Sequence, residues 1–92
     1  NKIMKLSTVK KRLKGYLRTE ILAPNHTVTV FENGNVLQSY DSIISIKVNH
    51  KTYLGPNWDF SRTTGKYRNL HLGTNKQEVL ERIKLQTYKV LE

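Results

Sequence analysis

Cysteine is absent from this 92-residue sequence, which excludes a disulfide framework, a zinc–thiolate site and a cysteine nucleophile. The sequence also has no long apolar run, so it predicts neither a membrane-spanning helix nor the apolar core of a signal peptide. Acidic residues are scarce: seven Asp and Glu stand against sixteen Lys and Arg, which gives a formal net charge of +9. A chain of this length predicts one domain, residues 1–92, with a small core.

The positive charge is concentrated at the start of the chain. Seven of the sixteen basic residues fall in the first eighteen positions, and the first acid is Glu20. These basic residues are Lys2, Lys5, Lys10, Lys11, Arg12, Lys14 and Arg18. From residue 19 onward nine basic residues face seven acids, a balance of +2. Such a concentration of positive charge creates an electrostatic field that attracts polyanions, so it indicates nucleic acid or an acidic protein surface as the partner.

The basic segment itself predicts a helix over about residues 7–18. Its apolar residues recur at helical spacing and form one stripe, made of Val9, Leu13, Tyr16 and Leu17. The opposite side would meet a phosphate backbone with Lys10, Lys11, Lys14 and Arg18. Gly15 disfavours a helix interior by up to about 1 kcal/mol, which leaves a second interpretation open. In that interpretation the helix ends at Gly15 and residues 16–23 take another form.

The middle of the chain predicts an antiparallel meander of three or four strands over about residues 27–54. The run Thr27–Phe31 is rich in β-branched residues, and the Asn33-Gly34 pair that follows it is the strongest short hairpin signal. The run from Ile43 to Val48 is the most apolar, and its alternation is expected to place Ile44, Ile46 and Val48 on one face of the sheet.

The last third of the chain predicts a loop or short helix, then a longer helix, then a short strand. The segment 58–73 has no clean period of two, and Ser61 is suited to cap a short helix within it. Thr74 followed by Gln77 is a capping-box pattern, which predicts a helix over about residues 75–86. Residues 87–91 suit a final strand. The fold class predicted from the whole chain is therefore α+β.

The segment 58–73 also mixes basic and aromatic side chains in a way that suits nucleic acid. Cations neutralise phosphates and aromatic faces stack on unpaired bases, so the candidates here are Arg62, Lys66, Tyr67 and Arg68. The alternative is structural, because a small domain needs its large aromatics for burial. Trp58 and Phe60 would then be core residues, and Asp59 would pair with Arg62 or cap a turn.

No catalytic residue, cofactor or metal is indicated. The three histidines lie 24 and 21 residues apart, and none has a metal-ligand spacing with another histidine or a carboxylate. His26 and His50 are expected in solvated turns. A metal-dependent nuclease would require three scattered residues to meet: Asp41, Asp59 and His71.

The run Trp58 to Asn69, followed by Leu72-Gly73 and a Lys/Glu-rich helix, resembles a family of small uncharacterised proteins from phages and prophages of Gram-positive bacteria. The resemblance covers about residues 33–92, so the basic N-terminal segment lies outside it and would be an addition of this protein. The family has no established activity, so no catalytic residue is carried over. The resemblance implies a binding protein of the host bacterial cytoplasm that occupies nucleic acid or blocks a host enzyme handling nucleic acid.

Three hypotheses follow. The first is a non-catalytic nucleic-acid-binding module with weak sequence preference, because no base-reading motif is present. The second hypothesis, the alternative to nucleic-acid binding, is a stoichiometric inhibitor of a host nucleoprotein or defence enzyme, of the anti-CRISPR or anti-restriction type. It would act through protein contact. The third is self-association through an exposed sheet edge, for which the strand Thr27–Phe31 is the candidate because it carries no lysine.

Overall fold

The computed structural model describes residues 4–92, and Lys2 lies outside them. Within the described residues the fold is α+β, as the sequence predicts, and a single sheet dominates it. The elements in chain order are α1 (Leu6–Lys10), β1 (Tyr16–Ala23), β2 (His26–Phe31), β3 (Gly34–Ser39), β4 (Ser42–Val48), β5 (Lys51–Leu54), α2 (Arg62–Leu72), α3 (Lys76–Lys84) and β6 (Tyr88–Val90).

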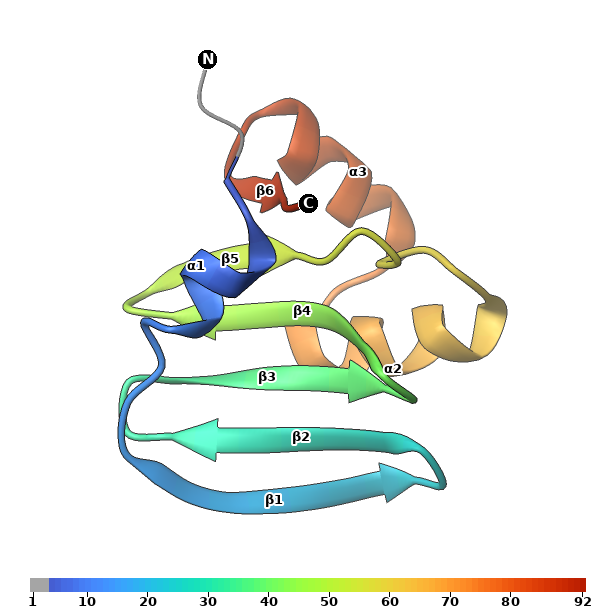
Figure 1. The fold of residues 1–92 in the computed structure, drawn as a ribbon. Helices are drawn as coiled ribbons and strands as arrows, with labels where there is room; N and C mark the ends of the chain where they lie inside the picture. The colour runs from blue at the N-terminus through green and yellow to red at the C-terminus, as the bar shows by residue number, and fades with distance from the viewer. Residues whose placement is uncertain (1–3) are drawn as a thin grey trace.

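The six strands follow one another across the sheet in chain order. Strands β1 to β5 form an antiparallel meander, whereas β6 runs parallel to β5 because α2 and α3 carry the chain back between them. Figure 1 shows α1 against one face of the sheet, α2 against the other face, and α3 beside β6. The meander therefore has five strands rather than three or four, and it begins at residue 16 rather than 27.

The predicted N-terminal helix over residues 7–18 is wrong in length. Helix α1 ends at Lys10, Lys11 is its C-cap, and Gly15 has a left-handed φ of +74°. The second interpretation of Gly15 is closer, because residues 16–23 do take another form: they are strand β1. A five-residue helix has little stability of its own, whereas the β-branched and aromatic residues beyond Gly15 gain ladder hydrogen bonds with β2.

The face of the sheet that α1 covers, here called the α1 face, holds the largest core cluster. It joins residues from α1 and the following turn to strands β3 to β5 and to the end of the chain: Val9, Leu13, Val36, Ile43, Ile46, Val48, Tyr53 and Leu91. The opposite face, here called the α2 face, holds two smaller clusters. One packs Tyr67 against Val28, Leu37 and Ile44, and the other joins Leu54 to α2, α3 and β6.

A β-bulge in β4 corrects the expectation that Ile44, Ile46 and Val48 share a face. The register of β3 with β4 shifts between Leu37 and Gln38, which pair with Ser45 and Ile43 and leave Ile44 without a partner. Ile44 consequently packs on the α2 face, while Ile46 packs on the α1 face. A bulge of this kind inserts one residue and reverses the alternation beyond it.

The two C-terminal helices begin with side-chain caps. Ser61 accepts a hydrogen bond from the Thr64 backbone N–H at the start of α2, as the sequence predicts, and Gly73 ends this helix in a left-handed conformation. The cap of α3 is Asn75 rather than the predicted Thr74, whose hydroxyl instead donates to Glu78. The helix occupies residues 76–84 of the predicted 75–86, and the predicted final strand is β6.

Strand β1 lies beyond both helical layers in Figure 1, whereas Tyr67 of α2 still packs on Val28 and His26 of β2. All of β1 from residue 16 to 22 is exposed. Strand β2 has a neighbour on each side, β1 and β3, so the expectation that Thr27–Phe31 forms a free sheet edge is wrong. The exposed edge on this side of the sheet is β1, which pairs with β2 alone within the described residues.

Candidate nucleic-acid interface

A basic surface lies on α1 and the turn that follows it. The cationic side chains of this segment are all exposed: Lys5, Lys10, Lys11, Arg12 and Lys14. Among residues 4–92 none of them forms an ion pair. The structure therefore brings together three residues predicted from the sequence, Lys10, Lys11 and Lys14. Lys5 and Arg12 lie beside them on the same segment.

Asn33, in the turn between β2 and β3, positions this basic segment. Its side-chain oxygen accepts from the Lys14 backbone N–H (2.8 Å), and its side-chain nitrogen donates to the Arg12 carbonyl (2.7 Å). Arg12 in turn donates from Nη1 to the Tyr53 hydroxyl (3.1 Å). The irregular stretch between α1 and β1 is thus fixed to the sheet, and its lysine side chains remain in solvent.

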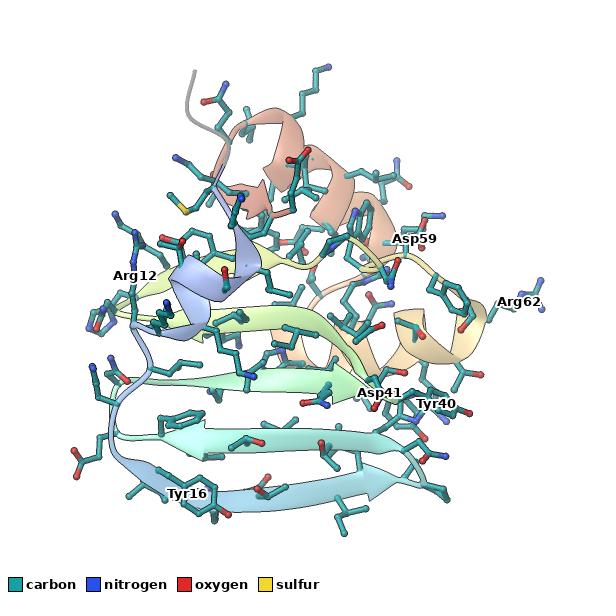
Figure 2. The ribbon with its side chains drawn as sticks, in the orientation of Figure 1. Arg12, Tyr16, Tyr40, Asp41, Asp59 and Arg62 are labelled. Atoms are coloured by element: carbon teal, nitrogen blue, oxygen red, sulfur yellow. The ribbon has the colours of Figure 1, made fainter. Side chains whose placement is uncertain are left out.

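An uncovered strip of the α1 face continues from the basic surface. Tyr16 is 62% exposed and stands edge-on to Phe31, with ring centroids 6.1 Å apart. Cross-strand pairs of an antiparallel ladder point to the same side, so the strip continues with Thr19 opposite Thr29 and Ile21 opposite Thr27. Figure 2 shows Arg12 and Tyr16 at the same end of the sheet.

Sequence reasoning does not identify Tyr16 and Phe31 as neighbours of the basic surface. The sequence pattern places Tyr16 in the apolar stripe of a helix, because residues 9, 13, 16 and 17 also fit a helical period. The signal that identifies the strand is the Pro24-Asn25 turn. It is a two-residue hairpin connection with a left-handed Asn25 between two β-rich runs.

Arg18 does not belong to the basic surface on α1. It lies on β1 opposite Val30, on the α2 face, and its Nε forms an ion pair with Glu20 (2.7 Å). The expectation that Arg18 shares a helix side with Lys10, Lys11 and Lys14 is wrong, because the helix ends before it.

The second predicted patch lies on α2, on the other face of the sheet. Arg62 and Lys66 are exposed there, and Figure 2 shows Arg62 at the opposite end of the sheet from Arg12 and Tyr16. Tyr67 is only half-buried, and its ring packs against the His26 ring with centroids 4.6 Å apart. The Lys66 Nζ lies 5.5 Å from the centroid of the Tyr67 ring. The two predicted patches therefore do not share one surface.

Arg68 is a buried structural residue, which corrects its assignment to a binding surface. Its side chain is 1% exposed. The guanidinium donates to the Trp58 carbonyl (3.0 Å), to Asp59 Oδ1 (3.3 Å) and to Asn69 Oδ1 (2.9 Å), and it lies 5.3 Å from the centre of the half-buried Trp58 ring. A residue so fully engaged holds the turn before α2 against the helix and has little capacity left for a ligand.

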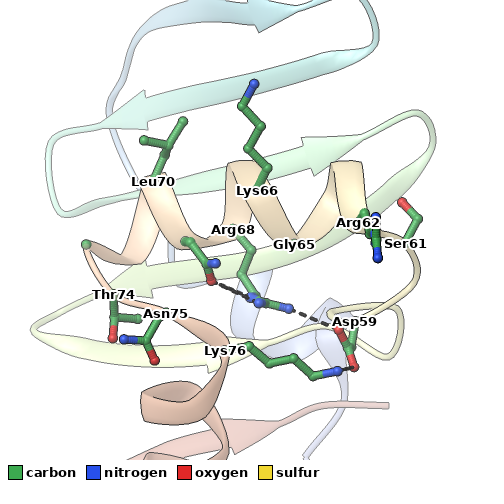
Figure 3. Close-up of a pocket in the computed structure, with 12 residues that line it drawn as sticks. Asp59, Ser61, Arg62, Gly65, Lys66, Arg68, Leu70, Thr74, Asn75 and Lys76 are labelled. Carbon is green, nitrogen blue, oxygen red and sulfur yellow. Dashed lines mark hydrogen bonds and ion pairs between the residues drawn. The ribbon is translucent and has the colours of Figure 1, made fainter.

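A groove of about 1010 Å³ lies between α2 and the start of α3. Figure 3 shows Arg68 at its floor, with Arg62, Lys66 and Lys76 around it. Asp59 is the acid of this groove. A hydrogen bond from Lys76 (2.9 Å), together with one from Arg68, lowers the pKa of its carboxyl below the ordinary value despite partial desolvation.

Two histidines lie between the sheet and α2: His26 is buried and His71 is half-buried. His26 is 4% exposed and bonds to the Pro24 carbonyl and the Ser39 hydroxyl, so the expectation that it lies in a solvated turn is wrong. His71 Nε2 contacts Asn35 Oδ1, which can only accept, so Nε2 donates and Nδ1 accepts from the Ser45 hydroxyl (2.6 Å). Desolvation, with a contribution from Lys47, lowers the pKa of His71 to about 4.

The described residues contain no group of three or more His, Asp or Glu side chains that could hold a metal ion. Asp59 is engaged by Lys76 and Arg68, and His71 by Ser45 and Asn35, so they do not meet Asp41 in a nuclease-like cluster. In the part of the chain that the structure describes, no helix has the length and apolar character needed to cross a membrane.

Comparison with known proteins gives a family but no relative of known activity. The model of a family of unknown function (DUF8033) matches residues 5–87, so the chain belongs to that family. The match begins at residue 5, so the basic N-terminal segment is part of the family's domain. The expectation that family resemblance starts near residue 33 and leaves this segment outside is therefore wrong. No curated protein and no solved structure matches the chain.

Proposed function

We propose that this member of the DUF8033 family binds single-stranded nucleic acid, without catalysis, on the α1 face of its sheet. The observation that carries the proposal is the junction of exposed, unpaired lysines with an uncovered aromatic strip. Lys10, Lys11 and Lys14 contact the phosphates, and Tyr16, beside Phe31, receives an unstacked base. The threonines of the strip offer hydroxyls to the sugar and phosphate.

The chemistry favours a single strand over a duplex. A ring exposed on a flat sheet face stacks on a base only when that base is unpaired. The basic surface on α1 and the strip also adjoin, since Lys14 precedes Tyr16 by two residues across the left-handed Gly15. In this proposal the protein is a phage-type accessory protein of the host bacterial cytoplasm, a role supported by the resemblance of its Trp58–Asn69 motif.

The test measures binding of labelled single- and double-stranded DNA and RNA by fluorescence anisotropy across a salt series. We expect a steep fall of log K with log salt. In a Lys10→Glu, Lys11→Glu, Lys14→Glu variant, loss of three phosphate contacts should reduce the slope for single strands by about 2. Tyr16→Ala should weaken single-strand binding by about 1–3 kcal/mol and leave duplex binding unchanged.

The matched control changes the same net charge elsewhere. Arg62→Glu, Lys66→Glu, Lys84→Glu replaces three exposed cations on α2 and α3, and it should retain the binding that the first triple variant loses. Equal losses in the two triple variants would show that net charge alone attracts nucleic acid. Absence of micromolar binding at low salt would rule out the proposal.

A second candidate function is inhibition of a host defence enzyme through protein contact, and the groove between α2 and α3 favours it. This groove combines exposed Arg62 and Lys66 with Leu70, which is 65% exposed, a mixture that fits an acidic segment with an apolar anchor. A pull-down from host lysate, with and without nuclease, separates the two functions. Bait-specific protein bands that survive nuclease, and that the Arg62, Lys66 and Lys84 variant loses, would support this second function.

A further inference from the structure

Strand β1 is a long sheet edge with apolar side chains in solvent. It has eight residues, and its large apolar side chains include Ile21, 77% exposed, and Tyr16, 62% exposed, together with Leu17 and Leu22. The other edge of the sheet, β6, has only three residues. An exposed edge of this length offers a row of backbone donors and acceptors to another strand, and natural proteins either protect such an edge or use it.

The register of β1 with β2 defines which part of the edge is regular. Leu17 and Leu22 have no partner on β2, so each is a bulge, and the uninterrupted stretch between them is Arg18 to Ile21. Within this stretch Arg18 and Glu20 point to the same side, opposite Val30 and Val28, and form an ion pair along the strand. A strand that pairs with β1 must therefore offer an acid opposite Arg18 and a base opposite Glu20, because like charges directly opposite each other are destabilising.

We propose that β1 pairs antiparallel with β1 of a second copy of this chain, about a two-fold axis at Thr19. In that register Arg18 lies opposite Glu20 of the second copy, and Glu20 lies opposite Arg18 of the second copy. Leu17 lies opposite Ile21 of the second copy at either end of the regular stretch. Directly opposed side chains in an antiparallel pair are neighbours, so both charge pairs and the apolar pairs flanking them are brought together.

The charges select this register over the adjacent ones. An axis at Arg18 would set two arginines opposite each other, and an axis at Glu20 would set two glutamates opposite each other. An axis between Thr19 and Glu20 would set Arg18 opposite Ile21, whose side chain points to the other face of the sheet, so that register does not form a regular antiparallel ladder. The strand is therefore complementary to its own two-fold copy in one register, which is what an isologous interface requires.

The pairing has a consequence for the rest of the molecule. A two-fold axis perpendicular to the sheet joins the two sheets edge to edge and keeps equivalent faces on the same side. Both basic surfaces on α1 and both strips containing Tyr16 would then lie on one side of the joined sheet. The inference does not rest on the proposed function, because the oligomeric state is measured without nucleic acid.

The test is analytical ultracentrifugation of the full chain from micromolar to millimolar concentration, with charge-exchange variants. The wild type should show a monomer–dimer equilibrium. Arg18→Glu or Glu20→Arg alone should weaken the dimer by about tenfold or more, because each places like charges opposite each other. The double variant should restore the wild-type affinity, and a mixture of the two single variants should form a heterodimer.

The exposed Glu81→Arg on α3 is the control for net charge and should leave the dimer unchanged. Circular dichroism and thermal melting establish that each variant is folded. A wild type that stays monomeric, or single variants that dimerise as well as the wild type, would overturn the proposal. So would a monomer whose β1 edge captures a strand of a different protein, because the edge would then serve a different partner.

Discussion

Arg68 shows how a cation within a basic segment can serve the fold alone. Its guanidinium fixes the Trp58–Asp59 turn to α2 by donating to the Trp58 carbonyl and to Asp59 Oδ1, and it also donates to Asn69 Oδ1 within the helix. Arg68→Ala would remove these bonds, leave Asp59 without one of its two cationic partners, and open a cavity beneath Gly65. We expect the free energy of unfolding to fall by about 3 kcal/mol or more, measured by urea denaturation.

The neighbouring Arg62 is the control for this prediction, because it is exposed on the same helix and makes no ion pair among the described residues. Arg62→Ala should change the free energy of unfolding by less than about 0.5 kcal/mol. Arg68→Lys should also destabilise, since an ammonium cannot reproduce the planar fork of donors. Equal stability of the Arg68→Ala and Arg62→Ala variants would contradict the structural role.

His71 makes stability depend on pH. Its pKa falls from 6.5 to about 4 on folding, so the unfolded chain binds more protons than the folded chain between those values. Stability is therefore fully present above pH 6.5 and is lost as the pH falls toward 4. The loss reaches about 2–3 kcal/mol, because protonation requires a charge in a desolvated site. Urea denaturation at a series of pH values measures it.

His71→Gln removes the titrating group and should flatten this part of the stability–pH profile. His50 provides the comparison, because it is exposed in the β4–β5 turn with a left-handed φ of +66° that asparagine tolerates. His50→Asn should leave the slope between pH 4 and 6.5 as it is in the wild type. If the His71→Gln profile kept the wild-type slope, another group would be responsible.

At the scale of elements, hairpins were easier to predict from sequence than the element around Gly15. The β2–β3 hairpin turns at Glu32 and Asn33, and Gly34 is the first residue of β3, so the local Asn-Gly signal predicts the hairpin but lies one residue beyond the turn itself. The run from Val9 to Leu17 satisfies a helical period, and Tyr16 to Ala23 also satisfies a strand. The choice depends on whether β2 offers a partner for those residues, which is tertiary information.

The candidate interface was predictable only in part, because some of its features are local in sequence and others depend on strand pairing. Lys10, Lys11 and Lys14 are neighbours in sequence, so any local structure keeps them close together. The face on which Arg18, Tyr16 and Phe31 lie depends on strand register, and one bulge reverses it, as Ile44 shows in β4. Burial of Arg68 depends on a turn ten residues earlier in the chain, and composition does not distinguish it from the exposed Lys66.

At the scale of the whole molecule, the last residues of the chain hold the basic segment in place. Leu91 is 1% exposed, packs in the cluster with Val9 and Leu13, and donates its backbone N–H to the Leu54 carbonyl (2.7 Å). Glu92 accepts from the Leu6 N–H (2.8 Å) and donates to the Met4 carbonyl (3.2 Å). Helix α1 is too short to be stable alone, so these contacts and the core determine whether its lysines form one surface.

Leu91→Ala should therefore reduce stability and loosen α1 together. We expect a loss of about 2–4 kcal/mol in the free energy of unfolding, which for a domain of this size lowers the melting temperature by at least about 8 °C. Hydrogen exchange should accelerate first at the amides of α1. Val90→Ala, at a position 44% exposed, should cost less than about 1 kcal/mol and leave α1 protected. If α1 exchanged no faster in Leu91→Ala than in Val90→Ala, the helix would owe its position to its own turn and to Asn33.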